Sequence, residues 1–155
     1  MPTKPIPEGY HSVTPTLAVD GAAEAIEFYK RAFGARERMR MPGPAGKIAH
    51  AELEIGDSVV MLSDPFPRST VKPPTELGGT SMSVFLYVED VDAVVQQALD
   101  LGATVTMPVE DMFWGDRFGS VSDPFGHSWS IATHKEDVPP EEMAERAKEA
   151  MASMS

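Results

Sequence analysis

Cysteine is absent from this chain of 155 residues. The protein therefore has no thiol nucleophile, no thiolate metal site and no disulfide framework, and a reducing cytoplasm is its expected location. Long apolar runs are missing too, which excludes a membrane-spanning helix as an expectation from the sequence. The opening segment Met1–Pro7 carries prolines and no apolar core. We therefore expect neither a signal peptide nor a membrane anchor at this end.

Basic residues are few, because 13 Lys and Arg stand against 24 Asp and Glu, giving a formal net charge of -11. Such an excess of negative charge repels a phosphate backbone, and the basic residues do not gather into a stripe. We therefore expect no nucleic-acid partner. A chain of this length can bury roughly two-thirds of the surface that its unfolded form exposes, so one domain over residues 1–155 needs no disulfide or metal to fold.

An internal repeat with a period of about 70 residues runs through the chain. Ala18–Gly21 opens a helix-like stretch that closes on Phe33–Ala35, and Tyr87–Asp90 opens another that closes on Leu101–Ala103. The matching ends of the two copies are Gly56–Asp64 and Gly126–His134. A period this long exceeds that of a solenoid repeat and indicates one duplicated module that cannot bury its sheet alone. The cleft between two packed modules is the expected place for a site.

Each module has the predicted order βαβββ, which gives an α+β fold with a cupped mixed sheet. Module 1, about residues 11–64, has a strand at Val13–Val19, a helix at Gly21–Phe33 and strands at Arg36–Met41, Lys47–Ile55 and within Gly56–Asp64. Module 2, about residues 81–134, has a strand at Met82–Val88, a helix at Val91–Leu101 and strands near Thr104–Val109, Asp116–Ser122 and Ser128–Thr133. Asp20 and Asp90 are predicted to cap the two helices. A linker rich in Pro and Gly occupies residues 65–80, and a weakly helical tail follows at 135–155.

Alternation along Lys47–Ile55 places His50 and Glu52 together on one face of a strand. A hairpin turning at Gly56–Asp57 then sets Glu52 opposite Met61 and places all three on the open, concave side of the sheet. A carboxylate beside an imidazole fixes its tautomer and favours its charged form, so His50 and Glu52 are the candidate catalytic base and its orienting group. The alternative is that both are solvated residues on an open sheet face.

Several motifs in order resemble the vicinal oxygen chelate superfamily, which includes glyoxalase I, extradiol dioxygenases, fosfomycin-resistance enzymes and bleomycin-binding proteins. They are the Phe28–Tyr29 pair, Phe33–Ala35 after the first helix, and Asp123–His127 before the last strand. Trp114–Val121 leading into Asp123–Trp129 resembles the PhnB-like subgroup. The resemblance covers about residues 11 to 134. It implies the glyoxalase/bleomycin resistance/dioxygenase fold and a homodimer.

Enzymes of that superfamily place His, Gln or Glu metal ligands on the first and last strand of each module. The motif match puts those positions at Thr14 (or Val13), Met61, Ser83 and Ser130. Zinc, nickel, manganese and iron prefer imidazole and carboxylate ligands, which these residues lack. We therefore expect no metal and no other cofactor. Thr14, Met61, Ser83 and Ser130 become candidate ligand-binding residues, since their side chains face the place where the metal would be.

Trp114, Asp116 and Arg117 form a second candidate site. An aromatic ring with a guanidinium and a carboxylate can hold a planar or anionic ligand. The alternative is that Asp116 and Arg117 pair with each other or with a neighbouring subunit. Tyr87 shares the strand face of Ser83 and is predicted to supply an apolar wall.

The remaining candidates have structural explanations. Asp123–Gly126 is first a turn, because Pro fixes φ and Gly allows positive φ. His127 follows it and is expected to be exposed. His11 and His134 lie at strand ends without a partner at metal-ligand spacing, so neither is expected to bind a metal.

The sequence thus favours a small-molecule-binding protein or enzyme of the PhnB-like group that works without a metal. Two alternatives remain. One is a metal-dependent lyase or dioxygenase like glyoxalase I, and the other is a protein that sequesters its ligand, as bleomycin-resistance proteins do. Neither the ligand nor the existence of a reaction follows from the residues, which show no phosphate loop, dinucleotide fingerprint or nucleophile elbow.

Overall fold

A computed structural model describes residues 2–154 and confirms the predicted α+β fold of two βαβββ modules. The first contains β1 (Thr16–Ala18), α1 (Ala22–Phe33), β2 (Arg36–Pro42), β3 (Ile48–Ile55) and β4 (Ser58–Ser63), with the 3-10 turn η1 (Pro44–Gly46) before β3. The second contains β5 (Ser83–Tyr87), α3 (Val91–Asp100), β6 (Thr104–Asp111), β7 (Asp116–Ser122) and β8 (Ser128–His134). The short helix α2 (Pro74–Leu77) lies between the modules, and α4 (Pro140–Met154) follows them.

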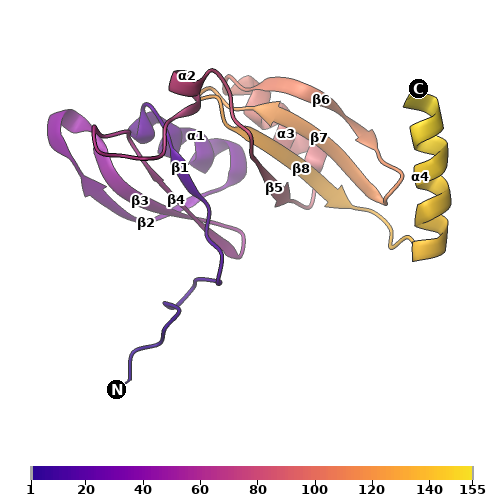
Figure 1. Ribbon diagram of the computed structural model, residues 1–155, viewed down its shortest axis with the longest axis horizontal. Coiled ribbons are helices and arrows are strands. Elements are labelled where there is room, and N and C mark those ends of the chain that lie inside the picture. The colour runs from indigo at the N-terminus through magenta and orange to yellow at the C-terminus, as the bar shows by residue number, and fades with distance from the viewer. Residues whose placement is uncertain (1, 155) are drawn as a thin grey trace.

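Both sheets are mixed and have the same topology. The first sheet has the strand order β1-β4-β3-β2 and the second has β5-β8-β7-β6. In each, the first strand pairs in parallel with the last, and the other pairs are antiparallel. Figure 1 shows the two sheets side by side, with β1 and β5 at the facing edges and with α1 and α3 behind them. The helices therefore cover one side of the molecule and leave the other side of each sheet open.

Helix α1 follows the predicted apolar stripe, since Ala22, Ala25, Ile26, Tyr29 and Phe33 are all buried. Its N-terminus is capped from a distance. The Asp64 carboxylate accepts hydrogen bonds from the backbone N–H groups of Gly21 (3.0 Å) and Ala22 (3.1 Å), and its other oxygen accepts from Ile48 N–H (2.7 Å). The prediction that Asp20 caps α1 is wrong, because Gly21 stands at the N-cap in a left-handed conformation. Asp90 caps α3 as predicted, accepting from Ala93 N–H.

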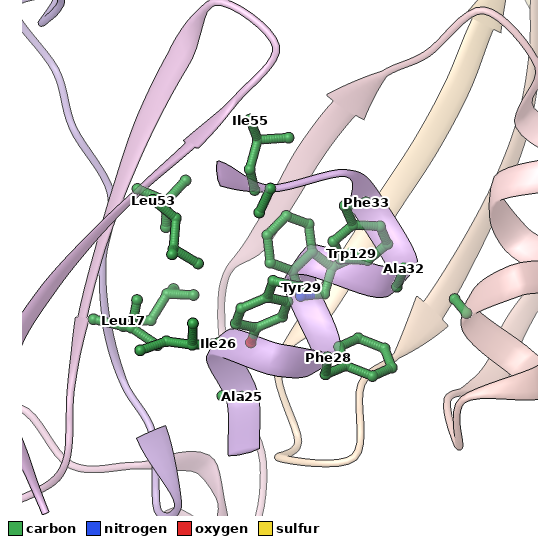
Figure 2. Close-up of a cluster of buried hydrophobic side chains, with 14 of the residues drawn as sticks. Leu17, Ala25, Ile26, Phe28, Tyr29, Ala32, Phe33, Leu53, Ile55 and Trp129 are labelled. Carbon is green, nitrogen blue, oxygen red and sulfur yellow. The ribbon is translucent and has the colours of Figure 1, made fainter. Parts of the chain in front are cut away.

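One hydrophobic core joins the two modules. The Trp129 side chain on β8 is fully buried, and its ring centroid lies 5.1 Å from that of Tyr29 and 4.5 Å from that of Phe33. Figure 2 shows these rings meeting next to Leu17 and Leu53 of the first sheet. Helix α1 thus packs against both sheets, and burial of these large rings stabilises the contact between the modules.

The Asp123 carboxylate reinforces this junction. One oxygen accepts hydrogen bonds from Tyr29 Oη (2.6 Å) and Trp129 Nε1 (2.9 Å). The other accepts from the backbone N–H groups of Phe125 and His127, both at 2.9 Å. Asp123–Gly126 is therefore a turn, as predicted, and also a link between the modules. Gly126 has φ +92, and a Cβ there would lie 2.8 Å from Cβ of Pro74.

His127 corrects one prediction. The sequence placed it at the surface, yet only 9% of the residue is exposed and its Nε2 lies 2.8 Å from the carbonyl oxygen of Ala18. The turn that precedes His127 folds back against β1, which brings the imidazole to the end of that strand. The ring is therefore part of the structure that joins the modules.

Helix α4 stands apart at the end of the molecule (Figure 1). None of its described residues is buried. Arg146 attaches it through bonds to Glu136 and the carbonyl oxygen of Phe113, and also pairs with Glu142 within the helix. Among residues 2–154, no helix is long and apolar enough to cross a membrane.

Candidate functional site

The open face of the second sheet is formed by side chains that alternate with the core residues of β5, β7 and β8. Val121, Trp129 and Ile131 point into the core, so their strand neighbours lie on the opposite side. We call this surface the second open face. It consists of Ser83, Phe85, Tyr87, Asp116, Phe118, Ser120, Ser128, Ser130 and His134, with Trp114 from the turn before β7.

Hydroxyl groups occupy one end of the second open face. Ser83 Oγ lies 2.9 Å from Ser130 Oγ and 3.3 Å from Ser128 Oγ, and Ser120 Oγ lies 3.4 Å from Ser130 Oγ. The structure therefore brings together Ser83 and Ser130, which the sequence named as ligand contacts. Hydroxyls both donate and accept hydrogen bonds, so this cluster can pair with ligand groups of either kind.

Aromatic rings occupy the middle of the face. The Phe85 centroid lies 5.0 Å from that of Tyr87 and 5.7 Å from that of Phe118, and the Trp114 centroid lies 5.7 Å from that of Phe118. We call these four residues the aromatic floor. Phe85 is 47% exposed and Tyr87 is 60% exposed, whereas Phe118 is buried. Phe118 was missed from the sequence, although strand alternation from Asp116 would have placed it on this face.

Asp116 anchors the other end of the face and is only 3% exposed. One carboxylate oxygen accepts hydrogen bonds from Tyr87 Oη (2.9 Å) and Trp114 Nε1 (3.0 Å), and the other lies 2.8 Å from His134 Nδ1. Burial opposes ionisation of Asp116, but these three hydrogen bonds outweigh it and lower the pKa of the carboxyl. The same carboxylate raises the pKa of the Tyr87 hydroxyl.

His134 was considered from the sequence only as a metal ligand. The hairpin of β7 and β8 pairs it directly with Asp116, and its Nε2 lies 2.7 Å from an oxygen of Asp137. Hydrogen bonds to Asp137 first, and to Asp116 second, raise the pKa of the imidazole. Counting residues back from the turn at 123–127 would have revealed the pairing with Asp116.

Arg117 lies on the opposite side of the second sheet. Its guanidinium makes two bonds to Asp92 of α3, at 2.7 and 3.0 Å, and one to Asp111 at 3.1 Å. The structure thus separates Arg117 from Trp114 and Asp116, because adjacent residues of a strand face opposite sides. Asp116 and Arg117 do not pair with each other either. The guanidinium fastens α3 to the second sheet.

His50 and Glu52 do meet on the open side of the first sheet, where His50 Nε2 lies 3.0 Å from Glu52 Oε2. The predicted register is confirmed, since Glu52 pairs with Met61. The segment before β1 crosses this surface. The guanidinium carbon of Arg38 lies over the Tyr10 ring, 5.0 Å from the ring centroid. A hydrogen bond from Tyr10 is the largest cause of the lowered pKa of Glu52. Glu52 is therefore held as a carboxylate among donors.

Two grooves connect these surfaces. One, of about 550 Å³, is lined by Tyr10, Glu52, Thr14 and Met61. The other, of about 400 Å³, lies between the modules and is lined by Thr14 together with Phe85 and Tyr87. Thr14 lines both grooves and so stands where the two modules meet. Among residues 2–154, no group of three or more His, Cys, Asp or Glu side chains has an arrangement that could hold a metal ion.

Comparison with known proteins identifies the family. The model of the Glyoxalase/Bleomycin resistance protein/Dioxygenase superfamily matches residues 10–131, which include the first module and the second up to the middle of β8. The chain belongs to this superfamily. The resemblance seen in the sequence motifs is thereby confirmed, and both the hydroxyl cluster and the aromatic floor lie within the matched residues.

Similar proteins include a mycobacterial relative and two proteins of the same fold. Uncharacterized protein Rv0887c of Mycobacterium tuberculosis is 49% identical over 130 residues, covering 82% of this chain and 76% of that protein. The crystal structure of TioX from Micromonospora sp. ML1 is 30% identical, with a TM-score of 0.64, covering 80% of this chain and 98% of TioX. TnmS3 from Streptomyces sp. CB03234, an antibiotic binding protein, shares the fold at 24% identity, with a TM-score of 0.62, covering 81% of this chain and 96% of TnmS3.

Proposed function

We propose that the protein binds a planar aromatic small molecule on the second open face. The observation that carries this proposal is the aromatic floor, where Phe85 and Tyr87 expose about half of their surface beside a cluster of hydroxyls. Burial of apolar surface contributes roughly 25 cal/mol per Å², and offset ring contacts add about 0.5–1.5 kcal/mol each. A flat ligand gains both terms on the floor and hydrogen bonds from the serines at its edge.

Binding without turnover is the role that the side chains support best. The proposed ligand lies next to hydroxyls and aromatic rings, which give recognition rather than a nucleophile or a free base. TnmS3 is a precedent for an antibiotic binding protein on this fold. The sequestering function, in which the ligand is held unchanged, therefore becomes our leading proposal, with a metal-independent enzyme second.

A specific observation favours the enzyme as the second candidate. His50 Nε2 lies 3.0 Å from the Glu52 carboxylate, and the groove beside Glu52 reaches Thr14. An imidazole oriented in this way can accept a proton from a ligand that spans both modules. Turnover that is lost in His50→Ala, with the fold retained, would support it.

We also propose that the protein is a homodimer in which the open faces of the two copies lie opposite each other and hold the ligand between them. Large apolar side chains stay exposed on the open sides of both sheets: Met39, Met41, Phe85, Tyr87 and Met107. An exposed apolar surface of this kind is typical of an interaction site. Light scattering after size-exclusion chromatography should give twice the chain mass of 16.8 kDa. A mass of one chain at micromolar concentration would contradict the dimer.

The test of the proposed function uses naphthalene-2-carboxamide as a neutral planar probe. Binding should quench tryptophan fluorescence and raise the melting temperature, because a ligand of the native state stabilises it by mass action. Phe85→Ala should weaken binding about tenfold, since one ring of the floor is lost. Leu77→Ala is the matched control, because Leu77 is 64% exposed but lies outside the second open face. Equal loss in both variants would contradict the proposed site.

The metal-dependent alternative has its own test. Addition of zinc, nickel or manganese should leave the melting temperature and probe binding unchanged if the proposal holds. Metal analysis of the purified protein checks the same point. A stoichiometric metal whose removal abolishes probe binding would favour the alternative.

A further inference from the structure

The two nitrogens of His134 each face a carboxylate. Nδ1 lies 2.8 Å from Asp116 Oδ1, and Nε2 lies 2.7 Å from Asp137 Oδ1. An ionised carboxylate only accepts hydrogen bonds, so each ring nitrogen must carry a proton to bond with its partner. The Asp116 carboxyl accepts from Tyr87 Oη and Trp114 Nε1 on one oxygen and faces His134 Nδ1 with the other, and these bonds lower its pKa and favour the carboxylate. In this geometry His134 is an imidazolium between two acids.

The two acids are held very differently. The Asp116 side chain is 2% exposed and lies at the start of β7, where Tyr87 and Trp114 also hold it. The Asp137 side chain is 100% exposed and lies in the segment between β8 and α4. An ion pair with such an exposed partner contributes little to stability, since water competes for it. Asp116 therefore fixes the ring, whereas Asp137 is easily exchanged.

From this arrangement we infer that His134 is an oxyanion-recognition group, and that the carboxylate of an aryl carboxylate ligand replaces Asp137 on its Nε2. The inference rests on the proposed aromatic ligand and names its polar group. The Tyr87 hydroxyl, the Trp114 indole and His134 all bond to the Asp116 carboxylate. The imidazolium therefore lies directly beside the aromatic floor, with only this carboxylate between them. A flat ring on the floor can therefore present its carboxylate to Nε2.

Charge balance supports the exchange. A ligand carboxylate brings to Nε2 the same single negative charge as the Asp137 side chain that it replaces, and the fully exposed Asp137 carboxylate can turn into water, which screens its charge. Toward the ligand carboxylate Asp116 acts through His134, because its Oδ1 fixes the direction in which Nε2 faces, while its Oδ2 holds Tyr87 and Trp114 of the aromatic floor. Asp116 is thus a positioning residue, and His134 is the group that contacts the ligand.

The test compares two probes of nearly the same shape, 2-naphthoate and naphthalene-2-carboxamide, by isothermal titration calorimetry. His134→Gln should weaken 2-naphthoate binding about fivefold or more, because a charge-assisted hydrogen bond is lost. Asp137→Ala should strengthen it about threefold, because the competing carboxylate is gone. Asp137→Ala should not change binding of the carboxamide by more than about twofold, and His134→Gln should weaken the carboxamide less than it weakens 2-naphthoate, because the carboxamide carries no charge. Opposite effects of two neighbouring substitutions are not expected from a purely structural role.

A double variant separates competition from general charge relief. With His134→Gln already present, Asp137→Ala should no longer strengthen 2-naphthoate binding, because there is no imidazolium to compete for. If Asp137→Ala strengthens naphthoate equally with and without His134, the inference is wrong. Equal binding of 2-naphthoate by the wild type and His134→Gln also overturns it. Because Asp137 is fully exposed, its variant should fold normally even if a His134 variant does not.

The outcomes separate this inference from the proposed function. Carboxamide binding that depends on Phe85, without any effect of His134 or Asp137 on naphthoate, leaves the aromatic site intact and overturns the carboxylate. Failure of both probes to bind overturns the aromatic site and the carboxylate together. For Asp116, the readout is the side-chain ¹⁵N signal of His134 Nδ1, which Asp116→Asn should shift because the Oδ1 that faces Nδ1 loses its charge, and an unchanged signal would contradict the positioning role of Asp116.

Discussion

Replacement of Asp123 by alanine should cost this protein a large part of its stability. The Asp123 residue is 4% exposed and accepts four hydrogen bonds, from Tyr29 Oη, Trp129 Nε1 and the backbone N–H groups of Phe125 and His127. Each buried donor that loses its acceptor costs about 1–3 kcal/mol. Removal of a buried charge and entry of water offset part of this, so we take the low end of each range.

The expected loss is therefore about 4 kcal/mol, against a total stability of about 5–15 kcal/mol for a typical domain. At about 2–4 °C per kcal/mol, the melting temperature should fall by roughly 8–16 °C. Urea unfolding followed by far-ultraviolet circular dichroism measures the difference. Because the same carboxylate links α1 to β8, both modules should unfold in one transition in the wild type.

Asp111→Ala is the matched control, because that side chain is 79% exposed. Its loss should stay within about 1 kcal/mol, as for surface ion pairs. Tyr29→Phe removes a single donor and should cost about 1–2 kcal/mol, with a smaller effect once Asp123 is already replaced. A loss below about 1.5 kcal/mol in Asp123→Ala would refute the role of Asp123 as the link between the modules.

Two further predictions concern backbone shape and pH. Gly126→Ala should destabilise the protein by about 2–4 kcal/mol, because φ is +92 and the new Cβ would meet Pro74. Gly56→Ala is the control: its φ is +59 but the space around it is open, so it should cost only about 1–2 kcal/mol. Similar losses in urea unfolding would mean that the contact at Pro74 is unimportant. The pKa of His134 is raised by Asp137 and Asp116, so its stabilising effect is complete below its ordinary pKa and is lost as pH rises through the raised value. Urea midpoints between pH 6 and pH 9 should therefore fall more in the wild type than in His134→Gln, and parallel curves would contradict this.

Local sequence patterns predicted much of the fold and part of the candidate site. The repeat and the apolar stripe of α1 predicted two βαβββ modules, because helix and strand periods are properties of neighbouring residues. Strand alternation also predicted that His50 and Glu52 meet, since residues two apart share a face. The same rule places Asp116 and Arg117, which are adjacent in β7, on opposite faces of the sheet, so alternation alone argues against a site that contains both.

The candidate site was predicted only in part, because its polar partners come from different strands. Ser83 and Ser130 were identified through the family motifs, and they do meet across β5 and β8. The pairing of Asp116 with His134 depends on the β7–β8 register, and Phe118 completes the floor only when three strands align. Short metal-ligand motifs do not reveal such contacts, because the number of residues between Asp116 and His134 depends on the length of the β7–β8 hairpin.

The sequence by itself determined the two modules, the family resemblance and the shared open face of His50, Glu52 and Met61. Only the tertiary structure decided that Asp64 caps α1 in place of Asp20, that His127 is buried, and that Asp123 joins the modules. Each of these contacts joins residues 42 or more positions apart in the chain. Periodicity describes how a segment places its own side chains, whereas the partner of a buried polar group is chosen by whichever distant segment packs against it.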